Sequence, residues 1–229
     1  MQITYVFHSC FVVETDRVVI VYDYWRDLNE GDLLRRLCGS DKSVYFVVSH
    51  FHHDHFNEEI FKVTNAFFLV SYDVLRRKRI PENVDFHELR PGYTFKDQRI
   101  EVHSFRSTDI GVCTLLSLPE VGTVFHAGDC NNWYFKGENN LLKVSPENMD
   151  KLFRSILRDV YSVAPSVDHV MFPLDPRLGE EMVRGVVQWL DTIKTGVLYP
   201  MHYWNEKQIM LEGVELLKLK FPDTFFYVP

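Results

Sequence analysis

The sequence predicts a layered α/β domain in which helices cover the outside of two β-sheets. Its first half is rich in short β-branched and aromatic runs, whereas its second half alternates strand-like and helix-like segments. No Gly/Ser-rich linker, internal repeat or low-complexity tract interrupts the 229 residues. We therefore expect one domain over residues 1–229, which is long enough to bury a substantial core.

Polar breaks separate the first apolar runs so closely that they predict consecutive antiparallel strands. The run VYFVV, residues 44–48, is apolar throughout and predicts a strand that is buried on both faces. A short helix is predicted over Glu30–Leu37. The strands predicted in this half are Ile3–Phe7, Phe11–Glu14, Val18–Tyr22, Val44–Val48, Phe67–Val70, Ile100–Phe105, Val112–Leu118 and Thr123–Phe125.

The second half begins with a helix start signal, a serine at 145 followed by proline at the first helical position. Apolar residues then recur with a helical period. Their common face consists of Met149, Leu152, Phe153, Ile156, Leu157 and Val160. The remaining predicted elements are strand Val170–Leu174, helix Gly179–Ile193, strand Gly196–Tyr199, helix Glu206–Lys220 and strand Thr224–Val228.

The composition is that of an ordinary soluble protein, with 46% hydrophobic and 25% charged residues. A net charge of −7 speaks against a nucleic-acid partner, and the basic run Arg76–Arg79 is short enough to be a solvated helix end. No segment approaches the ~18 apolar residues of a membrane helix. The N-terminus resembles a strand rather than a signal peptide, and four scattered cysteines predict no disulfides, so we expect a cytoplasmic protein without membrane insertion. Nothing in the sequence indicates an oligomeric state.

The stretch SHFHHDHFN, residues 49–57, directly follows the buried strand and carries the pattern His50-x-His52-x-Asp54-His55. A turn at a strand end directs alternate side chains into one pocket. Imidazole and carboxylate groups are the donors that a divalent cation such as Zn²⁺ accepts. The pattern therefore predicts a metal site, from which His53 is expected to point away.

This stretch resembles the HxHxDH signature of the metallo-β-lactamase superfamily, and later segments continue the resemblance in order. The resemblance implies a four-layer αβ/βα sandwich of two mixed sheets with helices on the outer faces. Two early segments are similar to those of the branch that includes ascorbate-6-phosphate lactonase and the lipid phosphodiesterases. The matching segments are FHSCFVVE and VIVYDYW near the N-terminus, HSFRSTD at 103–109, FHAGD at 125–129 and YPMH at 199–202.

The resemblance implies two divalent metal ions, with zinc as the first expectation. Its implied ligands are His50 and His52 for the first ion, Asp54, His55 and His202 for the second, and Asp129 between the two. A metal-bound hydroxide would then attack an acyl or phosphoryl centre. Asp54 would orient the nucleophile or move its proton, because a carboxylate beside dications stays ionised.

One position departs from the family pattern, because Ser107 stands where the third histidine of the first metal is expected. Asp109 is one replacement, and His103 is another if the strand is shorter than predicted. The third alternative is that the protein works with a single metal. A carboxylate in place of histidine would shift the preference toward Mn²⁺ or Fe²⁺.

Further side chains are candidates for the surroundings of the metals. His8 is expected to hold a ligand carboxylate or carbonyl rather than to bind a metal. His126 is either a buried histidine bonded to the backbone or part of the pocket wall. Trp133, which follows Asp129 closely, either lies over the metals or packs beneath a loop.

Asp175 and Arg177 follow a predicted buried strand, and reach the same rim as His202 if the two strands are parallel neighbours. Arg177 would then clamp an anionic group, or it forms a salt bridge with Asp175. Asp23 supports the metals or is a plain turn aspartate. Tyr203 and Trp204 are further candidates for the rim.

Taken together, these features predict a metal-dependent hydrolase that acts on a small-molecule ester, lactone or phosphodiester. The alternative is a non-catalytic or mononuclear protein of the same fold that binds a metal or ligand. A nuclease of the same superfamily is disfavoured by the net charge of −7. The name of the superfamily does not predict a β-lactam substrate for this protein, because proteins of this fold catalyse many different reactions.

Overall fold

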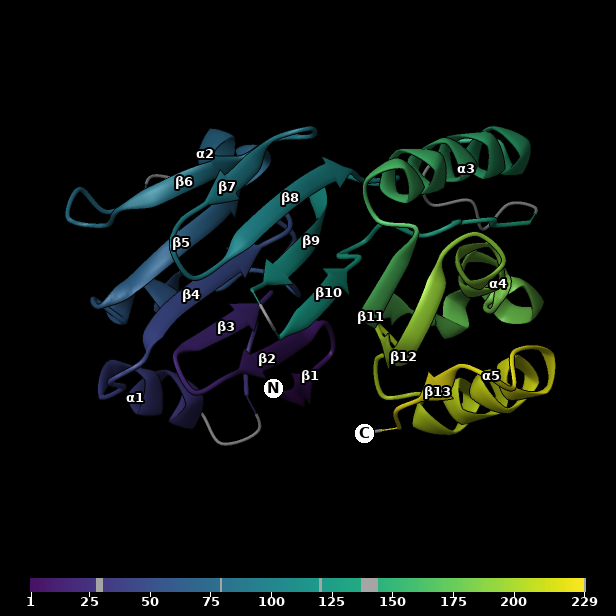
Figure 1. The fold of residues 1–229 in the computed structure, drawn as a ribbon. Helices are drawn as coiled ribbons and strands as arrows, with labels where there is room; N and C mark the ends of the chain where they lie inside the picture. The colour runs from purple at the N-terminus through teal and green to yellow at the C-terminus, as the bar shows by residue number, and fades with distance from the viewer. Residues whose placement is uncertain (28–30, 79, 120, 137–143, 229) are drawn as a thin grey trace.

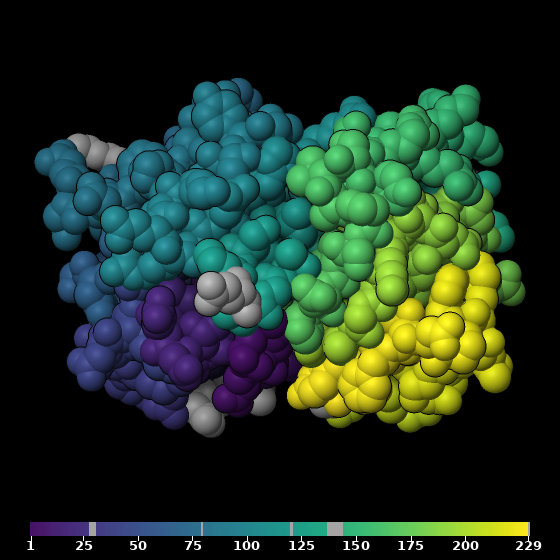
Figure 2. Space-filling model, in the orientation of Figure 1, coloured from purple at the N-terminus to yellow at the C-terminus, as the bar shows by residue number. Residues whose placement is uncertain are grey.

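A computed structural model describes residues 1–27, 31–78, 80–119, 121–136 and 144–228. Two mixed β-sheets lie face to face, and helices cover their outer sides (Figure 1). In the space-filling view the N-terminal strands lie against the C-terminal segment (Figure 2). The predicted layers are therefore confirmed.

The first sheet has the order β1-β2-β3-β4-β5-β6. Its first three strands are antiparallel, as predicted, and β3 to β6 run parallel. The strands are β1 (Gln2–Phe7), β2 (Cys10–Glu14), β3 (Val18–Tyr22), β4 (Ser43–Val48), β5 (Ala66–Ser71) and β6 (Phe86–Leu89).

The second sheet has the order β13-β12-β11-β10-β9-β8-β7. Strands β7 to β10 are antiparallel, whereas β10 to β13 run parallel, so each sheet joins an antiparallel half to a parallel half. The strands are β7 (Thr94–Lys96), β8 (Glu101–Arg106), β9 (Val112–Leu118), β10 (Gly122–His126), β11 (Ser166–Pro173), β12 (Lys194–Met201) and β13 (Phe225–Phe226).

Helices α1 and α2 cover the first sheet, and α3, α4 and α5 cover the second (Figure 1). Ser145 caps α3 by accepting a hydrogen bond from the Asn148 amide, and Pro146 opens the helix, as predicted. The helices are α1 (Asp32–Cys38), α2 (Tyr72–Arg77), α3 (Pro146–Val163), α4 (Arg184–Leu190) and α5 (Lys207–Lys220), with 3₁₀ helices η1 (Glu58–Lys62) and η3 (Pro176–Glu181). Among the described residues, none of these helices has the length and apolar character needed to cross a membrane.

Alternate residues of the central strands enter two different cores, because successive side chains of a strand point to opposite faces. In β4, Tyr45 and Val47 pack between the sheets, whereas Val44, Phe46 and Val48 pack under the outer helices. The prediction that this strand is buried on both faces is confirmed.

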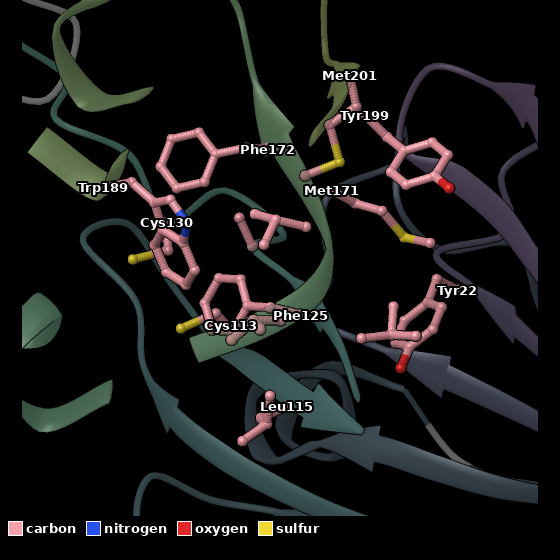
Figure 3. Close-up of a cluster of buried hydrophobic side chains, with 14 of the residues drawn as sticks. Tyr22, Cys113, Leu115, Phe125, Cys130, Met171, Phe172, Trp189, Tyr199 and Met201 are labelled. Atoms are coloured by element: carbon pink, nitrogen blue, oxygen red, sulfur yellow. The ribbon is translucent and has the colours of Figure 1, made fainter. Parts of the chain in front are cut away.

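The second sheet repeats this arrangement on its own outer face. Phe125 of β10 and Phe172 of β11 pack on Trp189 of α4, with ring centroids 4.3 and 5.6 Å away, and Met171 points to the opposite side of the strand (Figure 3). Both sheets are therefore packed on their two faces, which supports the side chains at their strand ends.

Several boundaries differ from the prediction. The expected helix over Gly179–Ile193 is shorter: α4 spans Arg184–Leu190 and is preceded by η3, inside which Gly179 has φ 57° and ψ −126°. The terminal strand is shortened to Phe225–Phe226. Strands β6 and β7 were not predicted, helix α2 was indicated only by the basic run at its end, and the predicted start of the first helix at Glu30 lies outside the described residues.

Two smaller predictions can be compared with the structure. Arg76 and Arg77 occupy the last turn of α2, which agrees with a solvated helix end; Arg79 lies outside the described residues. All four cysteines are free thiols.

Candidate metal centre

The histidine-rich stretch forms a tight turn between β4 and η1. The backbone amides of His55 and Phe56 both donate to the carbonyl of His52, and Asn57 caps η1 while its side-chain amide donates to the carbonyl of Trp25. His50 and His55 are buried by this turn, whereas the His53 side chain is 81% exposed and lies at the mouth of a cavity.

The other candidate residues come from strand ends that meet at the same edge of the two sheets. Asp129 follows β10, Asp175 follows β11 and His202 follows β12. Strands β10, β11 and β12 are parallel neighbours, so their carboxyl ends lie side by side. Asp109 comes from the connection between β8 and β9. Sequence-distant side chains thus converge on the turn after β4.

A first cluster consists of His50, His52, Asp109 and Asp129, whose potential ligand atoms all lie within 4.8 Å of one another. His50 Nε2 lies 3.3 Å from Asp129 Oδ2. His52 Nδ1 lies 3.6 Å from Asp109 Oδ2 and 3.8 Å from Asp129 Oδ2. Two imidazoles and two carboxylates at this spacing suit a divalent cation.

A second cluster consists of His8, Asp54, His55 and His202, again within 4.8 Å. His8 Nε2 lies 3.2 Å and His202 Nε2 lies 3.8 Å from Asp54 Oδ2. His55 Nε2 and His202 Nε2 lie 3.0 and 3.2 Å from Asp129 Oδ1. Asp129 therefore directs one carboxylate oxygen to each cluster.

Several of these atoms are buried and make no well-aligned hydrogen bond among the described residues, although each lies 3.0–3.2 Å from a potential ligand atom of the clusters. They are His8 Nε2, His55 Nε2, His202 Nε2 and Asp129 Oδ1. Buried polar atoms are rarely left unpaired, because each one costs about 1–3 kcal/mol. Nitrogen and oxygen lone pairs that converge in this way fit a bound cation, so the residues present are suitable for a metal centre.

Asp23 orients one histidine of each cluster. Its Oδ2 lies 2.7 Å from His55 Nδ1, and because an ionised carboxylate only accepts, the proton is on Nδ1 and Nε2 is free for a metal. Ser49 donates its backbone N–H to Asp23 Oδ1 (2.7 Å) and its hydroxyl to Asp23 Oδ2 (2.6 Å). The Ser49 oxygen then accepts from His50 Nδ1 at 2.9 Å, so His50 Nε2, which lies 3.0 Å from His52 Nδ1, carries no proton of its own. Asp23 thus has the supporting role that was one of its two predicted alternatives.

Asp175 does the same for His202. Its Oδ2 lies 2.8 Å from His202 Nδ1, and both of its oxygens accept from the Arg177 guanidinium, at 2.6 to 3.0 Å. The structure brings Asp175 and His202 to one rim, and Arg177 forms the predicted salt bridge with Asp175. Burial alone would raise the pKa of Asp175, but His202 and Arg177 lower it, so the carboxylate is ionised.

The electrostatics of the clusters are strongly coupled. Burial alone would raise the pKa of Asp129, yet the charges of His55 and His202 hold it well below its usual range. Burial alone would lower the pKa of His202, but Asp129 raises it to about 9. For His8, burial dominates and lowers the pKa to about 4. The carboxylates thus favour a second proton on His55 and His202, and a metal bound through either Nε2 would displace that proton.

Backbone strain is concentrated at the same place. The four non-glycine residues with positive φ in the described chain are His8 (56°), Asp23 (42°), His202 (61°) and Trp204 (53°). Such conformations cost about 1–3 kcal/mol each and persist where the surroundings impose them. All four lie in or beside the two clusters.

One glycine allows a close backbone approach to this site. A Cβ on Gly111, whose φ is +76°, would lie 2.1 Å from the carbonyl oxygen of Ser49 and 2.6 Å from His50 Cβ. The connection after Asp109 can therefore pack directly on the start of the histidine-rich turn only because this residue lacks a side chain.

Of the candidates for the missing third histidine, the structure brings Asp109 to the first cluster. His103 lies on β8, where its Nδ1 contacts Thr94 Oγ1 at 2.6 Å, and it belongs to neither cluster. Ser107 accepts a hydrogen bond from the Asp109 amide at 3.3 Å. His8, expected to lie outside the ligand set, is a member of the second cluster, with its Nε2 3.2 Å from Asp54 Oδ2.

His126 is a buried histidine bonded to the backbone, one of its two predicted alternatives. Its Nε2 lies 2.8 Å from the carbonyl oxygen of Ser9, and its ring stacks on Tyr22 with centroids 4.6 Å apart. Tyr203 is buried too and stacks on Tyr5, so it does not line the rim.

A cavity of about 330 Å³ opens over the two clusters. Its aromatic wall consists of Trp133, Phe135 and Trp204. The Trp133 indole donates to the carbonyl of Asp129 at 2.8 Å, which holds the ring over the site, as one of the two alternatives predicted. Arg177 also lines the cavity.

Two groups of supporting residues were not predicted from the sequence. Ser49 belongs to no predicted site, although a polar residue at the end of a buried strand is a usable signal. Asn132, Asp150 and Gln188 form a hydrogen-bonded network that anchors the segment after Asp129 to α3 and α4. No local pattern connects these three residues.

Comparison with known proteins supports the fold. The sequence matches no protein-family model and no curated protein. Among solved structures, Igni18, a metallo hydrolase from the archaeon Ignicoccus hospitalis, superposes with a TM-score of 0.66 at 17% identity, covering 99% of this chain and 94% of its own. The metallo-β-lactamase fold protein YhfI from Bacillus subtilis has a TM-score of 0.58 at 9% identity, covering 96% and 88%.

CmlA, a diiron β-hydroxylase from Streptomyces venezuelae, has a TM-score of 0.67 at 14% identity over 99% of this chain. The match covers 52% of CmlA, so this chain spans about half of that protein. These similarities show that the chain has the metallo-β-lactamase fold.

Proposed function

We propose that this protein is a metal-dependent hydrolase that acts on a small ester, lactone or phosphodiester through two divalent cations. The observation that carries the proposal is the position of Asp129, which directs Oδ1 to His55 and His202 and Oδ2 to His50. A buried carboxylate with this disposition suits a bridge between two cations.

The first cation would be held by His50, His52, Asp109 and Asp129. The second would be held by His55, His202, Asp54 and the other oxygen of Asp129. Zinc fits the imidazole-rich second cluster. The two carboxylates of the first cluster make it a harder ligand set, so Mn²⁺ or Fe²⁺ competes with zinc for that cluster.

When bound, such cations acidify a water molecule and polarise the oxygen of the attacked group. The chain's own contribution is positioning and proton transfer. Asp54 directs Oδ2 toward the second cluster and Oδ1 toward His53 at the cavity mouth, so Oδ1 is the atom that we assign to receive a proton from water. Trp133, Phe135 and Trp204 exclude solvent on one side and confine the ligand to small molecules.

The decisive test combines two measurements on protein purified without added metal. Elemental analysis gives its metal content, and assays on a panel of esters, lactones and phosphodiesters give its hydrolytic activity. We expect two equivalents of metal, and loss of both metal and hydrolysis in Asp129→Ala. His87→Ala, a change of an exposed histidine outside the cavity, is the matched control and should keep both.

A constant single equivalent would contradict the two-metal site. Two equivalents without hydrolysis of any compound on the panel would instead favour a non-catalytic metal-binding protein of the same fold.

A further inference from the structure

We propose that the site takes a small substrate with an anionic group, which Arg177 binds, on an apolar and preferably aromatic body that packs against Trp133 and Trp204. This inference rests on the proposed hydrolase function and names the substrate class of the same cavity. It follows from the contacts of the Arg177 guanidinium and from the composition of the wall around it.

The guanidinium of Arg177 is only partly used by the protein. Nε and Nη2 bond to Asp175, whereas Nη1 has no hydrogen-bond or ion-pair partner among the described residues. The side chain is 43% exposed and lines the cavity, while Asp175 is fully buried. The Nε and Nη2 side of the guanidinium is therefore fixed by Asp175, and Nη1 is available to donate to a carboxylate or phosphate oxygen.

Aromatic rings hold this guanidinium in place. The Arg177 Cζ lies 5.3 Å from the ring centroid of Trp204 and 6.0 Å from that of Trp133. The Trp133 ring is itself fixed by its hydrogen bond to Asp129, and it lies parallel to Phe135 with centroids 6.2 Å apart. A ligand anion would thus meet a preorganised cation beside flat apolar surfaces, which lowers the entropy lost on binding.

The charges around the cavity set the condition under which an anion binds. Asp54, Asp109 and Asp129 line the same cavity and would repel an anion, unless cations occupy the two clusters. Asp175 compensates part of the Arg177 charge, but its oxygens face His202 and the guanidinium. Net attraction for an anion therefore depends on Arg177 in addition to the metal ions.

The first test compares the affinities of phenylacetate and phenylacetamide for the metal-loaded protein. Binding is measured by tryptophan fluorescence, since two of the four tryptophans line the cavity. A charge-assisted hydrogen bond corresponds to a preference of roughly 10- to 100-fold for the anion. We expect this preference to fall close to one in Arg177→Gln. Arg184→Gln removes an arginine that stacks on Tyr134 outside the cavity, and should keep the preference.

Metal content is measured for every variant, because Arg177 also contacts Asp175. Equal binding of the two probes would overturn the proposal. So would a preference that survives in metal-loaded Arg177→Gln, since the metal ions alone would then bind the anion.

The second test separates this proposal from the hydrolase itself. 3-Acetoxybenzoate and phenyl acetate carry the same ester, with and without a carboxylate remote from it. We expect kcat/KM for the anionic ester to fall roughly 10- to 100-fold in Arg177→Gln, mainly through KM, with little change for the neutral ester. Hydrolysis of both esters without charge preference overturns the Arg177 subsite alone. Charge-selective binding without hydrolysis of either overturns the hydrolase alone.

Discussion

Replacing Asp23 by asparagine should weaken metal binding at both clusters at once, although Asp23 is a member of neither cluster. Its carboxylate accepts from the Ser49 amide, the Ser49 hydroxyl and His55 Nδ1. Through Ser49 it also determines that His50 carries its proton on Nδ1. Asparagine cannot accept all of these bonds, because one of its two side-chain atoms is a donor.

Each orientation of the new amide has a cost. With Nδ2 toward His55, that histidine must accept on Nδ1 and move its proton to Nε2, the atom directed at the second cluster. The Ser49 hydroxyl would then turn to His50, with the same result at the first cluster. With Nδ2 toward the Ser49 amide, two buried donors face each other, which costs about 1–3 kcal/mol.

Loss of such an orienting partner typically lowers metal affinity roughly 10- to 100-fold, or about 1.4–2.7 kcal/mol. Chelator competition on Asp23→Asn should give this loss for both equivalents. Asp97→Asn is the matched control, because Asp97 accepts from the Tyr45 hydroxyl at 2.6 Å and from two backbone amides away from the clusters. Unchanged affinity in Asp23→Asn, or loss at one site only, would refute the reasoning.

Three further changes test other parts of the structure. Gly111→Ala should lower the metal content at the first cluster by displacing His50, since its Cβ would lie 2.1 Å from a backbone oxygen; normal metal content would show that the backbone yields easily. His103→Ala should keep both equivalents of metal whereas Asp109→Ala loses one, and elemental analysis that finds the reverse would reinstate the histidine as the ligand. Phe153→Ala should lower the free energy of unfolding of the metal-free protein by about 3–5 kcal/mol, because this fully buried ring leaves a cavity; chemical denaturation that shows less than about 1 kcal/mol would contradict its place in the core.

Local sequence patterns were sufficient for most of the fold. The apolar run of β4 and the capped, periodic segment of α3 carry their structure in adjacent residues, so their burial and extent could be predicted. Elements without such a pattern were missed: β6 and β7 are short edge segments with partly exposed residues. The helix predicted over Gly179–Ile193 is present as the shorter α4, because apolar spacing does not mark where the 3₁₀ helix η3 ends and the α-helix begins.

The candidate site divides in the same way. The sequence by itself determined the histidine-rich turn, because its donors are adjacent and their spacing alone predicts a metal site. Only the tertiary structure decided that Asp109 rather than His103 joins the first cluster and that His8 reaches the second. It also decided that Asp23 sets the tautomers of His50 and His55. These outcomes depend on where strands from different parts of the chain end relative to one another, and that is fixed by sheet pairing and packing rather than by neighbouring residues.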